Sequence, residues 1–218
     1  MATAGERHIT TSADGSTTIW VPGLDEHYHS IHGALTESNH VFIDAGLKAL
    51  DRNPVILLEV GLGTALNARL TGDYCATHGI EARYDALEKF PLKAEEIQQL
   101  ASAGMTKEVP YLSAVPGQST EIHPNFRFTL LVEDLRAFQA PENTYDLIYF
   151  DAFAPSAQPE LWSEEVFENM YRILKPGGIL TTYCAKGSVK RAMKAAGFEI
   201  EALPGPPRKR EMTRAWKR

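Results

Sequence analysis

Short apolar runs, each followed by a helix-like stretch, recur along this 218-residue chain and limit the folds open to it. The run VILLEV, Val55–Val60, and the run DLIYF, residues 146–150, are almost continuously apolar. Such runs are typical of strands that are covered on both faces, as in a parallel sheet. Helical stretches between the strands then predict an α/β fold with a doubly wound, mostly parallel sheet.

Apolar periodicity and turn residues divide the chain into expected elements. Strands are expected at residues 9–11, 17–21, 55–60, 82–87, 126–131, 146–150, 179–183, 198–203 and 211–216. Helices are expected at residues 38–50, 64–78, 92–103, 135–138, 164–174 and 189–196. The first two strands, joined by the turn-forming residues 13–15, predict a small N-terminal β-hairpin, and the last two predict an antiparallel C-terminal edge. Pro176, Gly177 and Gly178 are expected to stop one helix and start the next strand.

The composition, with 44% hydrophobic and 23% charged residues, is typical of one globular domain. The sequence has no apolar run of the ~18 residues that a membrane helix needs, and its start lacks a signal-peptide pattern. A cytoplasmic protein that does not bind membranes is therefore expected. Cys75 and Cys184 have no thiol neighbours in the sequence, so neither a disulfide framework nor a zinc site is expected, and Cys184 is predicted to lie in the core.

The net charge of −6 conceals an uneven distribution. Residues 1–185 hold 12 basic and 25 acidic side chains, whereas residues 186–218 hold 10 basic and 3 acidic ones. A basic C-terminal part favours contact with a polyanion. Charge alone leaves open the alternative of a solvated helix face and tail.

A glycine-containing turn, LEVGLGTALN (residues 58–67), follows the first long apolar strand. Gly61 and Gly63 allow a ligand to approach the backbone, and the start of the next helix offers free N–H groups. This pattern indicates a nucleotide-binding loop. It departs from the dinucleotide fingerprint because Leu66 stands at the third glycine position, and an ordinary tight turn is the alternative.

Acidic residues lie at the ends of four consecutive predicted strands: Glu59, Glu88, the pair Glu133 and Asp134, and Asp151. Each alone could be a surface carboxylate. Because the carboxyl ends of parallel strands share one edge, together they predict an acidic pocket. Such a pocket repels phosphates and stabilises a cationic ligand that carries a ribose, and S-adenosylmethionine meets that description.

The strand ends suggest a role for each acid in such a pocket. Glu88 is expected to bind the ribose hydroxyls, Asp134 to lie near the adenine amine, and Glu59 with Gly61 and Gly63 to hold the amino acid end. Asp151, released from a buried strand into a loop, is the candidate for chemistry. With its unperturbed pKa of about 3.9 it is a poor base, but it can accept a hydrogen bond from an amine and stabilise the positive charge that grows there.

Five segments resemble the MnmC-like family of bacterial enzymes, which finish 5-methylaminomethyl-2-thiouridine at the tRNA wobble position. They are YHSIHGALTESNHVFI (28–43), EVGLGTALN (59–67), EKFPL (88–92), DAFAPSAQPELW (151–162) and GPPRKREM (205–212). In addition, RILKPGGIL (172–180) resembles a helix-to-strand turn of class I methyltransferases. The resemblance implies a Rossmann-like class I methyltransferase fold, with residues 1–50 as hairpin and lid segment and residues 51–218 as the methyltransferase domain.

The same resemblance implies S-adenosylmethionine-dependent N-methylation of 5-aminomethyl-2-thiouridine in the tRNA anticodon loop. The better-known members are fused to a flavin-dependent oxidase, whereas this chain resembles the stand-alone form, so a separate FAD-dependent oxidase activity is a candidate partner. Further residues that the resemblance places near the cofactor are Tyr28, His29, Gly33, Glu37, Ser38 and Lys89.

Aromatic and basic residues are candidates for acceptor binding. Phe153 lies in a loop similar to that of amino-group methyltransferases, although Ala152 and Phe153 replace its two prolines; it either stacks on the target base or caps the core. Expected phosphate contacts are Lys186, Lys190, Arg191, Lys194, Arg208, Lys209 and Arg210. Residues 208–210 could instead approach the target base or the acidic rim.

A group of histidines has ligand-like spacing: His27, His29, His32 and His40, with Glu37 among them. The resemblance assigns this segment to the lid, so no metal is expected.

Two other functions remain open. One is methylation of a small-molecule amine, which predicts no salt-sensitive tRNA affinity. The other is a nicotinamide-dependent oxidoreductase that uses the same glycine turn.

Overall fold

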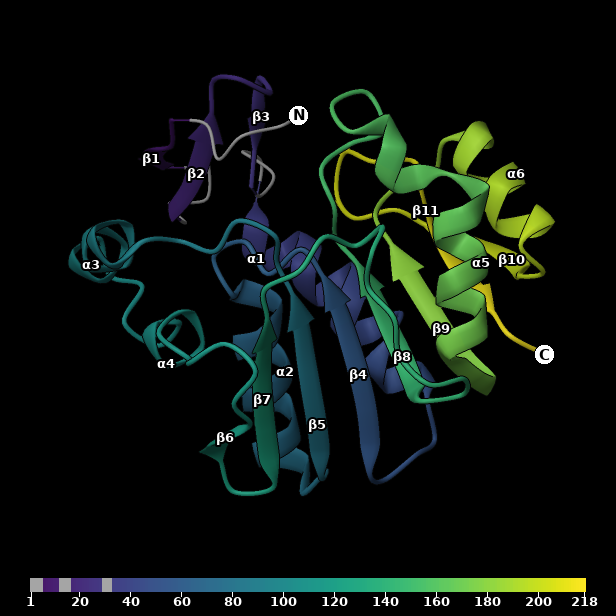
Figure 1. Cartoon of the computed structure of the whole chain (residues 1–218), viewed down its shortest axis with the longest axis horizontal. Coiled ribbons are helices and arrows are strands. Elements are labelled where there is room, and N and C mark those ends of the chain that lie inside the picture. Colours follow the sequence, from purple (N-terminus) through teal and green to yellow (C-terminus); the bar gives the residue numbers. More distant parts are fainter. Residues whose placement is uncertain (1–5, 12–16, 29–32) are drawn as a thin grey trace.

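A central eight-stranded sheet organises the computed structural model, which describes residues 6–11, 17–28 and 33–218 (Figure 1). From one edge to the other its strands are β10 (Glu199–Pro204), β11 (Glu211–Trp216), β9 (Leu174–Thr182), β8 (Tyr145–Phe150), β4 (Val55–Val60), β5 (Ala82–Leu87), β7 (Phe126–Leu131) and β6 (Thr120–His123). The five strands from β9 to β7 are parallel, whereas β11, β10 and β6 pair antiparallel with their neighbours. The predicted α/β fold and its antiparallel C-terminal edge are confirmed.

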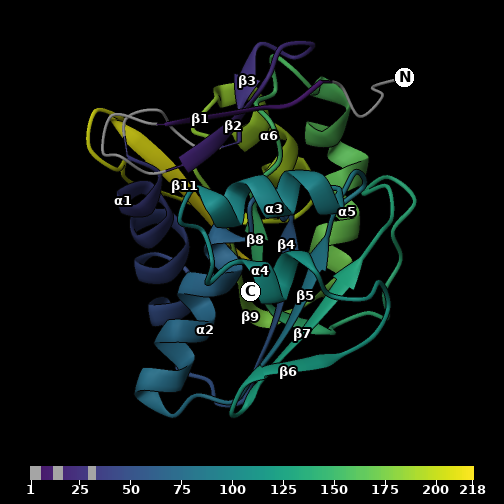
Figure 2. The same cartoon turned by 90° about the vertical axis from the view of Figure 1, so that its left-hand side faces the viewer.

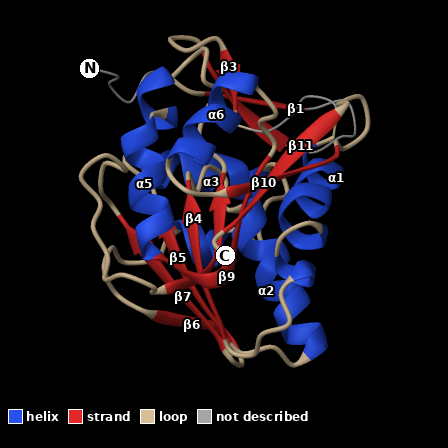
Figure 3. Ribbon diagram, turned by 90° about the vertical axis from the view of Figure 1, so that its right-hand side faces the viewer, coloured by secondary structure: helices blue, strands red, loops and turns tan. Residues whose placement is uncertain are grey.

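Helices cover both faces of this sheet because the central strands are apolar on both sides (Figure 3). In β4, Leu57 belongs to the core that includes Cys75 of α2 (Leu66–His78). The next residue, Leu58, belongs to the core that includes Met170 of α5 (Glu164–Ile173) and Met193 of α6 (Gly187–Ala195). Neighbouring strand residues point to opposite faces, so one strand serves two cores. Cys75 and Cys184 are free and buried, as predicted for Cys184.

A small antiparallel sheet stands above the carboxyl ends of the parallel strands (Figures 1 and 2). It consists of β1 (His8–Thr11), β2 (Thr17–Val21) and β3 (Glu26–His27). The strands of the predicted hairpin are confirmed, while its turn, residues 13–15, lies outside the described residues. The helix predicted at residues 38–50 is three short pieces instead: α1 (Ala34–Ser38), the π-helical η1 (Asn39–Asp44) and η2 (Leu47–Ala49). Gly46, with φ −103° and ψ −82°, separates the last two.

Four further elements differ from the sequence prediction. Residues 135–138 form a single turn, in which the N–H groups of Ala137 and Phe138 both donate to the Asp134 carbonyl, rather than a helix. The expected helix after β5 is α3 (Ala94–Ser102), and it is followed by α4 (Val109–Leu112) and β6, which were not predicted. β9 begins at Leu174, because a register shift against β8 accommodates the Pro-Gly-Gly segment within the strand. Among the described residues no helix has the length and apolarity needed to cross a membrane.

Candidate active site

A cavity of about 1220 Å³ lies where the parallel strands end and the N-terminal sheet begins. The strand ends contribute Gly61, Gly63, Glu88 and Asp151 to its wall. Ligand pockets usually measure roughly 300–1,000 Å³, so this cavity has room for a nucleoside-sized cofactor and part of a second molecule. Its position outside the carboxyl ends is where open α/β sheets bind ligands.

The turn after β4 depends on its two glycines. Gly61 has φ 88° and Gly63 has φ 55°, values that suit glycine. A Cβ on Gly61 would lie 2.6 Å from the carbonyl oxygen of Asp151, and one on Gly63 would lie 3.4 Å from the ring of Tyr28. The bare backbone of this turn therefore forms one wall of the cavity.

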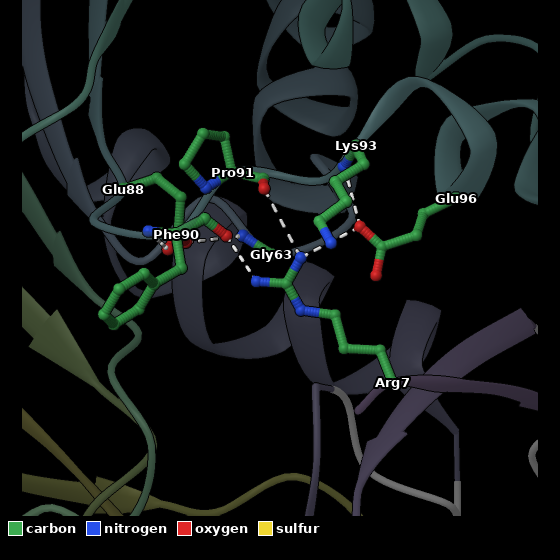
Figure 4. Close-up of polar contacts among 7 residues, drawn as sticks. All are labelled: Arg7, Gly63, Glu88, Phe90, Pro91, Lys93 and Glu96. Carbon is green, nitrogen blue, oxygen red and sulfur yellow. Dashed lines mark hydrogen bonds and ion pairs between the residues drawn. The ribbon is translucent and has the colours of Figure 1, made fainter. Parts of the chain in front are cut away.

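Glu88 joins the glycine turn to the end of β5 (Figure 4). One carboxylate oxygen accepts a hydrogen bond from the N–H of Phe90 at 2.9 Å, and the other accepts one from the N–H of Gly63 at 3.4 Å. A carboxylate has about four lone-pair sites, so Glu88, which lines the cavity, can still accept hydrogen bonds from two hydroxyls. Its position fits the predicted contact with a ribose.

Asp134 lies at the wall but is already paired with cations. Its carboxylate accepts hydrogen bonds from Lys89 Nζ at 2.8 Å and from Arg136 Nη2 at 2.6 Å. The Arg136 hydrogen bond and the Lys89 ammonium hold the pKa of Asp134 well below its ordinary value. The two cations neutralise the negative charge of Asp134, which the sequence analysis had counted toward an acidic pocket. Arg136 had not been identified from the sequence.

Asp151 follows β8 directly and is partly buried in the wall of the cavity. Burial raises its pKa to about 7, opposed by a hydrogen bond from the Asn67 amide and by the Lys209 charge. Its pKa therefore differs from the ordinary value of about 3.9 expected from the sequence, while it stays below the value of about 10.4 of an alkyl ammonium ion. Near neutral pH its carboxyl group can exchange a proton with a bound amine.

Glu59 lies below the cavity rather than in its wall. Its side chain is fully buried and belongs to β4, on the side that faces α2. One oxygen accepts a hydrogen bond from Asn67 at 2.9 Å. Burial raises the pKa of Glu59 well above its ordinary value, and the Asp151 charge raises it further. The predicted direct contact of Glu59 with the amino acid end of a cofactor does not match this position.

Aromatic and charged side chains form another part of the wall, beside the glycine turn and the loop that follows β8. Tyr28 and Phe153 meet edge to face with ring centroids 5.4 Å apart. The Phe153 carbonyl accepts a hydrogen bond from Trp162 at 2.8 Å, which fixes this loop. Glu37 pairs with Lys209 at 2.5 Å, and Lys209 also lies 4.8 Å from the centre of the Tyr183 ring. This part of the wall, the aromatic side of the cavity, thus carries two rings and one ion pair, whereas the polar side consists of the glycine turn, Glu88 and Asp134.

Arg7, which the sequence did not single out, fastens the N-terminal segment to the cavity wall (Figure 4). Its guanidinium donates to the carbonyls of Phe90 at 2.5 Å and Pro91 at 3.3 Å, and to Glu96 at 3.0 Å. It also lies 5.8 Å from the centre of the Tyr28 ring. Arg7 therefore connects three parts of the chain that cover the cavity.

Two parts of the predicted basic set, Lys186 and residues 208–210, lie at the carboxyl end of β9, the end of the sheet where the cavity lies. Lys186 precedes α6 just after β9, and residues 208–210 form the loop that leads into β11. Since β11 pairs antiparallel with β9, its start lies beside the carboxyl end of β9. Lys186, Arg191, Lys194, Arg208, Lys209 and Arg210 are exposed, while Lys190 pairs with Glu211 at 2.6 Å. Only Lys209 of the loop reaches the cavity wall.

The histidine group is described in part. His29 and His32 lie outside the described residues. His27 lines the cavity, whereas His40 hydrogen-bonds the Pro204 carbonyl at 2.8 Å. Within the described ranges, no three His, Cys, Asp or Glu side chains gather as metal ligands would.

The strand order and the bare glycine turn place the chain among Rossmann-like enzymes with the class I methyltransferase fold. Its structure superposes on the crystal structure of MnmC2 from Aquifex aeolicus with a TM-score of 0.79 at 23% identity, covering 98% of this chain and 71% of that one. Residues 89–218, more than half of the chain, match the model of a family described as S-adenosyl-L-methionine-dependent methyltransferases. The chain belongs to this family, and the predicted cofactor, S-adenosylmethionine, is confirmed at the level of the family.

Curated relatives support the resemblance noted in the sequence. The tRNA 5-methylaminomethyl-2-thiouridine biosynthesis bifunctional protein MnmC of Pseudomonas aeruginosa is 32% identical over 85% of this chain. The protein of the same name from Cupriavidus metallidurans is 32% identical over 93%. The chain spans only 31% and 32% of the lengths of these two relatives.

Proposed function

We propose that this protein transfers a methyl group from S-adenosylmethionine to the primary amine of 5-aminomethyl-2-thiouridine at the tRNA wobble position. One observation carries the proposal: Asp151, whose pKa is about 7, lies between the glycine turn and the aromatic wall of one cavity. The names of the MnmC relatives support the tRNA substrate. We also propose a cytoplasmic location and a flavin-dependent oxidase as a separate activity.

The cofactor would be held on the polar side of the cavity. Glu88 would accept hydrogen bonds from the ribose hydroxyls, and the turn from Gly61 to Gly63 would support the amino acid end. Lys89 and Asp134, already paired with each other, would border the adenine. When bound, the cofactor supplies a methyl group on a positively charged sulfur. The carboxylates of Glu88 and Asp151, which line the cavity, would stabilise the positive charge on that sulfur.

Asp151 would act on the acceptor amine. An alkyl ammonium ion resembles a lysine side chain, whose pKa is about 10.4, and cannot attack until it loses a proton. A carboxylate whose pKa is about 7 accepts that proton more readily than an ordinary aspartate does. After it passes this proton to water, the Asp151 carboxylate accepts a hydrogen bond from the neutral amine and stabilises the positive charge that develops on nitrogen.

The acceptor base would enter on the aromatic side. Phe153 and Tyr28 offer ring faces and edges, and unpaired bases in RNA loops commonly stack on such side chains. The exposed residues Lys186, Arg208 and Arg210 would contact phosphates on either side of the base. Lys209 and Glu37, paired at the wall, would border the entrance.

Labelled S-adenosylmethionine and tRNA that lacks the terminal methyl group test this function directly. After digestion to nucleosides, label is expected in 5-methylaminomethyl-2-thiouridine. Asp151→Asn should lower kcat by roughly 100- to 10,000-fold. Its affinity for the cofactor should change much less.

Two outcomes would contradict the proposal. Label in a free aminomethyl nucleoside or another small amine, but not in tRNA, would favour a small-molecule methyltransferase. Label in tRNA at another nucleoside would place the acceptor elsewhere. The nicotinamide-dependent alternative has no support from the family to which the chain belongs.

A further inference from the structure

Asn67 connects two carboxyl groups that the sequence treats as separate. It is the second residue of α2, and its side chain is 2% exposed. Its amide nitrogen lies 2.8 Å from Asp151 Oδ2 and 2.9 Å from Glu59 Oε1. A carboxamide has two N–H hydrogens, so each carboxyl receives one.

The position of Asn67 is fixed by the helix that carries it. Ala65, at the helix start, adopts a left-handed backbone with φ 63°, and its N–H donates to the Leu62 carbonyl at 2.8 Å. One turn further on, the Thr71 hydroxyl donates to the Asn67 carbonyl at 2.7 Å. The amide therefore presents its hydrogens to the carboxyls from a rigid element.

This contact orients the carboxylate of Asp151. Since Oδ2 is directed to Asn67, Oδ1 is the oxygen left for the cavity that Asp151 lines. A single oriented oxygen can meet an amine in line with a methyl donor, whereas a freely rotating carboxylate cannot hold that geometry.

Glu59 supports the arrangement from below. Its Oε2 and the Tyr84 hydroxyl are both buried, and a hydrogen bond from Tyr84 opposes the effect of burial on the pKa of Glu59. Burial raises the pKa of Glu59 well above its ordinary value, which favours a neutral carboxyl there. A neutral Glu59 leaves the negative charge of the pair on Asp151, next to the cavity.

We propose that Asn67 is a positioning residue for methyl transfer: its amide turns one oxygen of Asp151 toward the acceptor amine and ties Asp151 to the buried Glu59. The inference rests on the proposed role of Asp151. Other charged or titratable groups that act on this pair are Glu37 from α1, Lys209 from the loop before β11, Tyr84 from β5, Glu88 after β5, Tyr149 from β8 and Tyr183 after β9. Substitution of Asn67 leaves all of these in place.

The test is the titration of Asp151 itself. It is monitored by carbon-13 NMR of protein labelled at the aspartate carboxyl carbons. The spectrum of Asp151→Asn identifies the signal. Wild-type Asp151 is expected to titrate at about pH 7. Because the Asn67 hydrogen bond lowers this pKa, Asn67→Ala should move the midpoint to higher pH. An unchanged midpoint in Asn67→Ala would overturn the inference.

Thr77→Val is the matched control, because it removes the same kind of helix contact, a hydroxyl bonded to the carbonyl four residues earlier, without touching Asn67 or either carboxyl. It should leave the Asp151 midpoint where it is, and an equal shift in Thr77→Val would also refute the inference. If Asn67→Ala does not fold, Asn67→Ser replaces it. A hydroxyl has one hydrogen and cannot serve both carboxyls, so the titration should still change.

Methyl transfer gives a second readout. Asn67→Ala should lower kcat at pH 7 by about 10- to 100-fold, with little change in the KM for the cofactor, and should move the acid limb of the pH profile upward. A pH-independent loss that matches the folded fraction would indicate a merely structural residue. If wild-type protein methylates no tRNA, the proposed function fails, while the titration of Asp151 still decides the role of Asn67.

Discussion

The backbone of Gly61 packs directly against the backbone of Asp151: a Cβ on Gly61 would lie 2.6 Å from the Asp151 carbonyl oxygen. The Asp151 N–H also donates to the Val60 carbonyl at 2.9 Å. The turn that supports the cofactor and the residue proposed for chemistry are therefore one rigid unit. A change in the turn is expected to move both.

Gly61→Ala should lower both stability and cofactor affinity. The added methyl group would require a backbone shift, and φ 88° is strained for alanine, so we expect a loss of about 1–3 kcal/mol in the free energy of unfolding. Thermal unfolding and calorimetric titration with S-adenosylhomocysteine measure the two effects. Gly79→Ala is the control, since Gly79 also has a positive φ, 65°, but open space around its Cβ position. Equal loss of affinity in both variants would contradict this explanation.

Asp151 and Glu59 should make the protein less stable as the pH rises toward neutrality. Burial raises the pKa of Asp151 to about 7 in the folded state, while an unfolded aspartate titrates near 3.9. Between about pH 3.9 and pH 7 the folded protein binds more protons than the unfolded protein does. Its free energy of unfolding therefore falls with increasing pH. Asp151→Asn, which does not titrate, should show a smaller fall in Tm from pH 5 to pH 8. Asp73→Asn, which removes a carboxyl on α2 outside the cavity, should keep the wild-type slope.

Arg7→Ala should loosen the attachment of the N-terminal segment to the wall of the cavity. The guanidinium is only 6% exposed and serves the carbonyls of Phe90 and Pro91 as well as Glu96. Its loss removes three hydrogen bonds from a charged donor to partly buried acceptors, at a cost of about 1–3 kcal/mol, and frees the N-terminal segment. Stopped-flow measurement should show faster cofactor dissociation. Glu96→Gln removes the charge of one partner only and should have a smaller effect; equal rates in wild type and Arg7→Ala would rule out a covering role.

The sequence predicted the sheet well because its central strands are short apolar runs between turn residues. β4, β5, β7 and β11 have the predicted bounds. By contrast, α4 has four residues and contains a proline, and β6 reads TEIH, so neither carries a clear apolar period. Edge strands are held by their neighbours rather than by an apolar pattern of their own.

The site was only partly predictable. The glycines and acids could be located because they follow strands, but the partners of those acids come from distant segments. Asn67 and Asp151 are 84 residues apart, and Arg7 and Glu96 are 89 apart. One missed signal was present: Glu59 lies on the same side of β4 as Leu57, so strand alternation directs it under α2 rather than into the cavity.

Lys186→Ala and Arg210→Ala should weaken tRNA binding without changing the reaction centre. Both side chains are exposed at the edge of the sheet where the cavity opens, and neither lines the cavity. A phosphate contact releases counterions, so each substitution should lower the slope of log affinity against log salt by about 0.7 for single-stranded RNA. Filter binding at several salt concentrations measures the slope. Arg127→Ala should leave both affinity and slope unchanged, because Arg127 is the second residue of β7, at the opposite end of the parallel strands from the cavity, and pairs with Glu121. A phosphate-binding role for residues 186 and 210 would be excluded if the slope stayed at its wild-type value in both variants, because a neutral surface contact does not depend on salt.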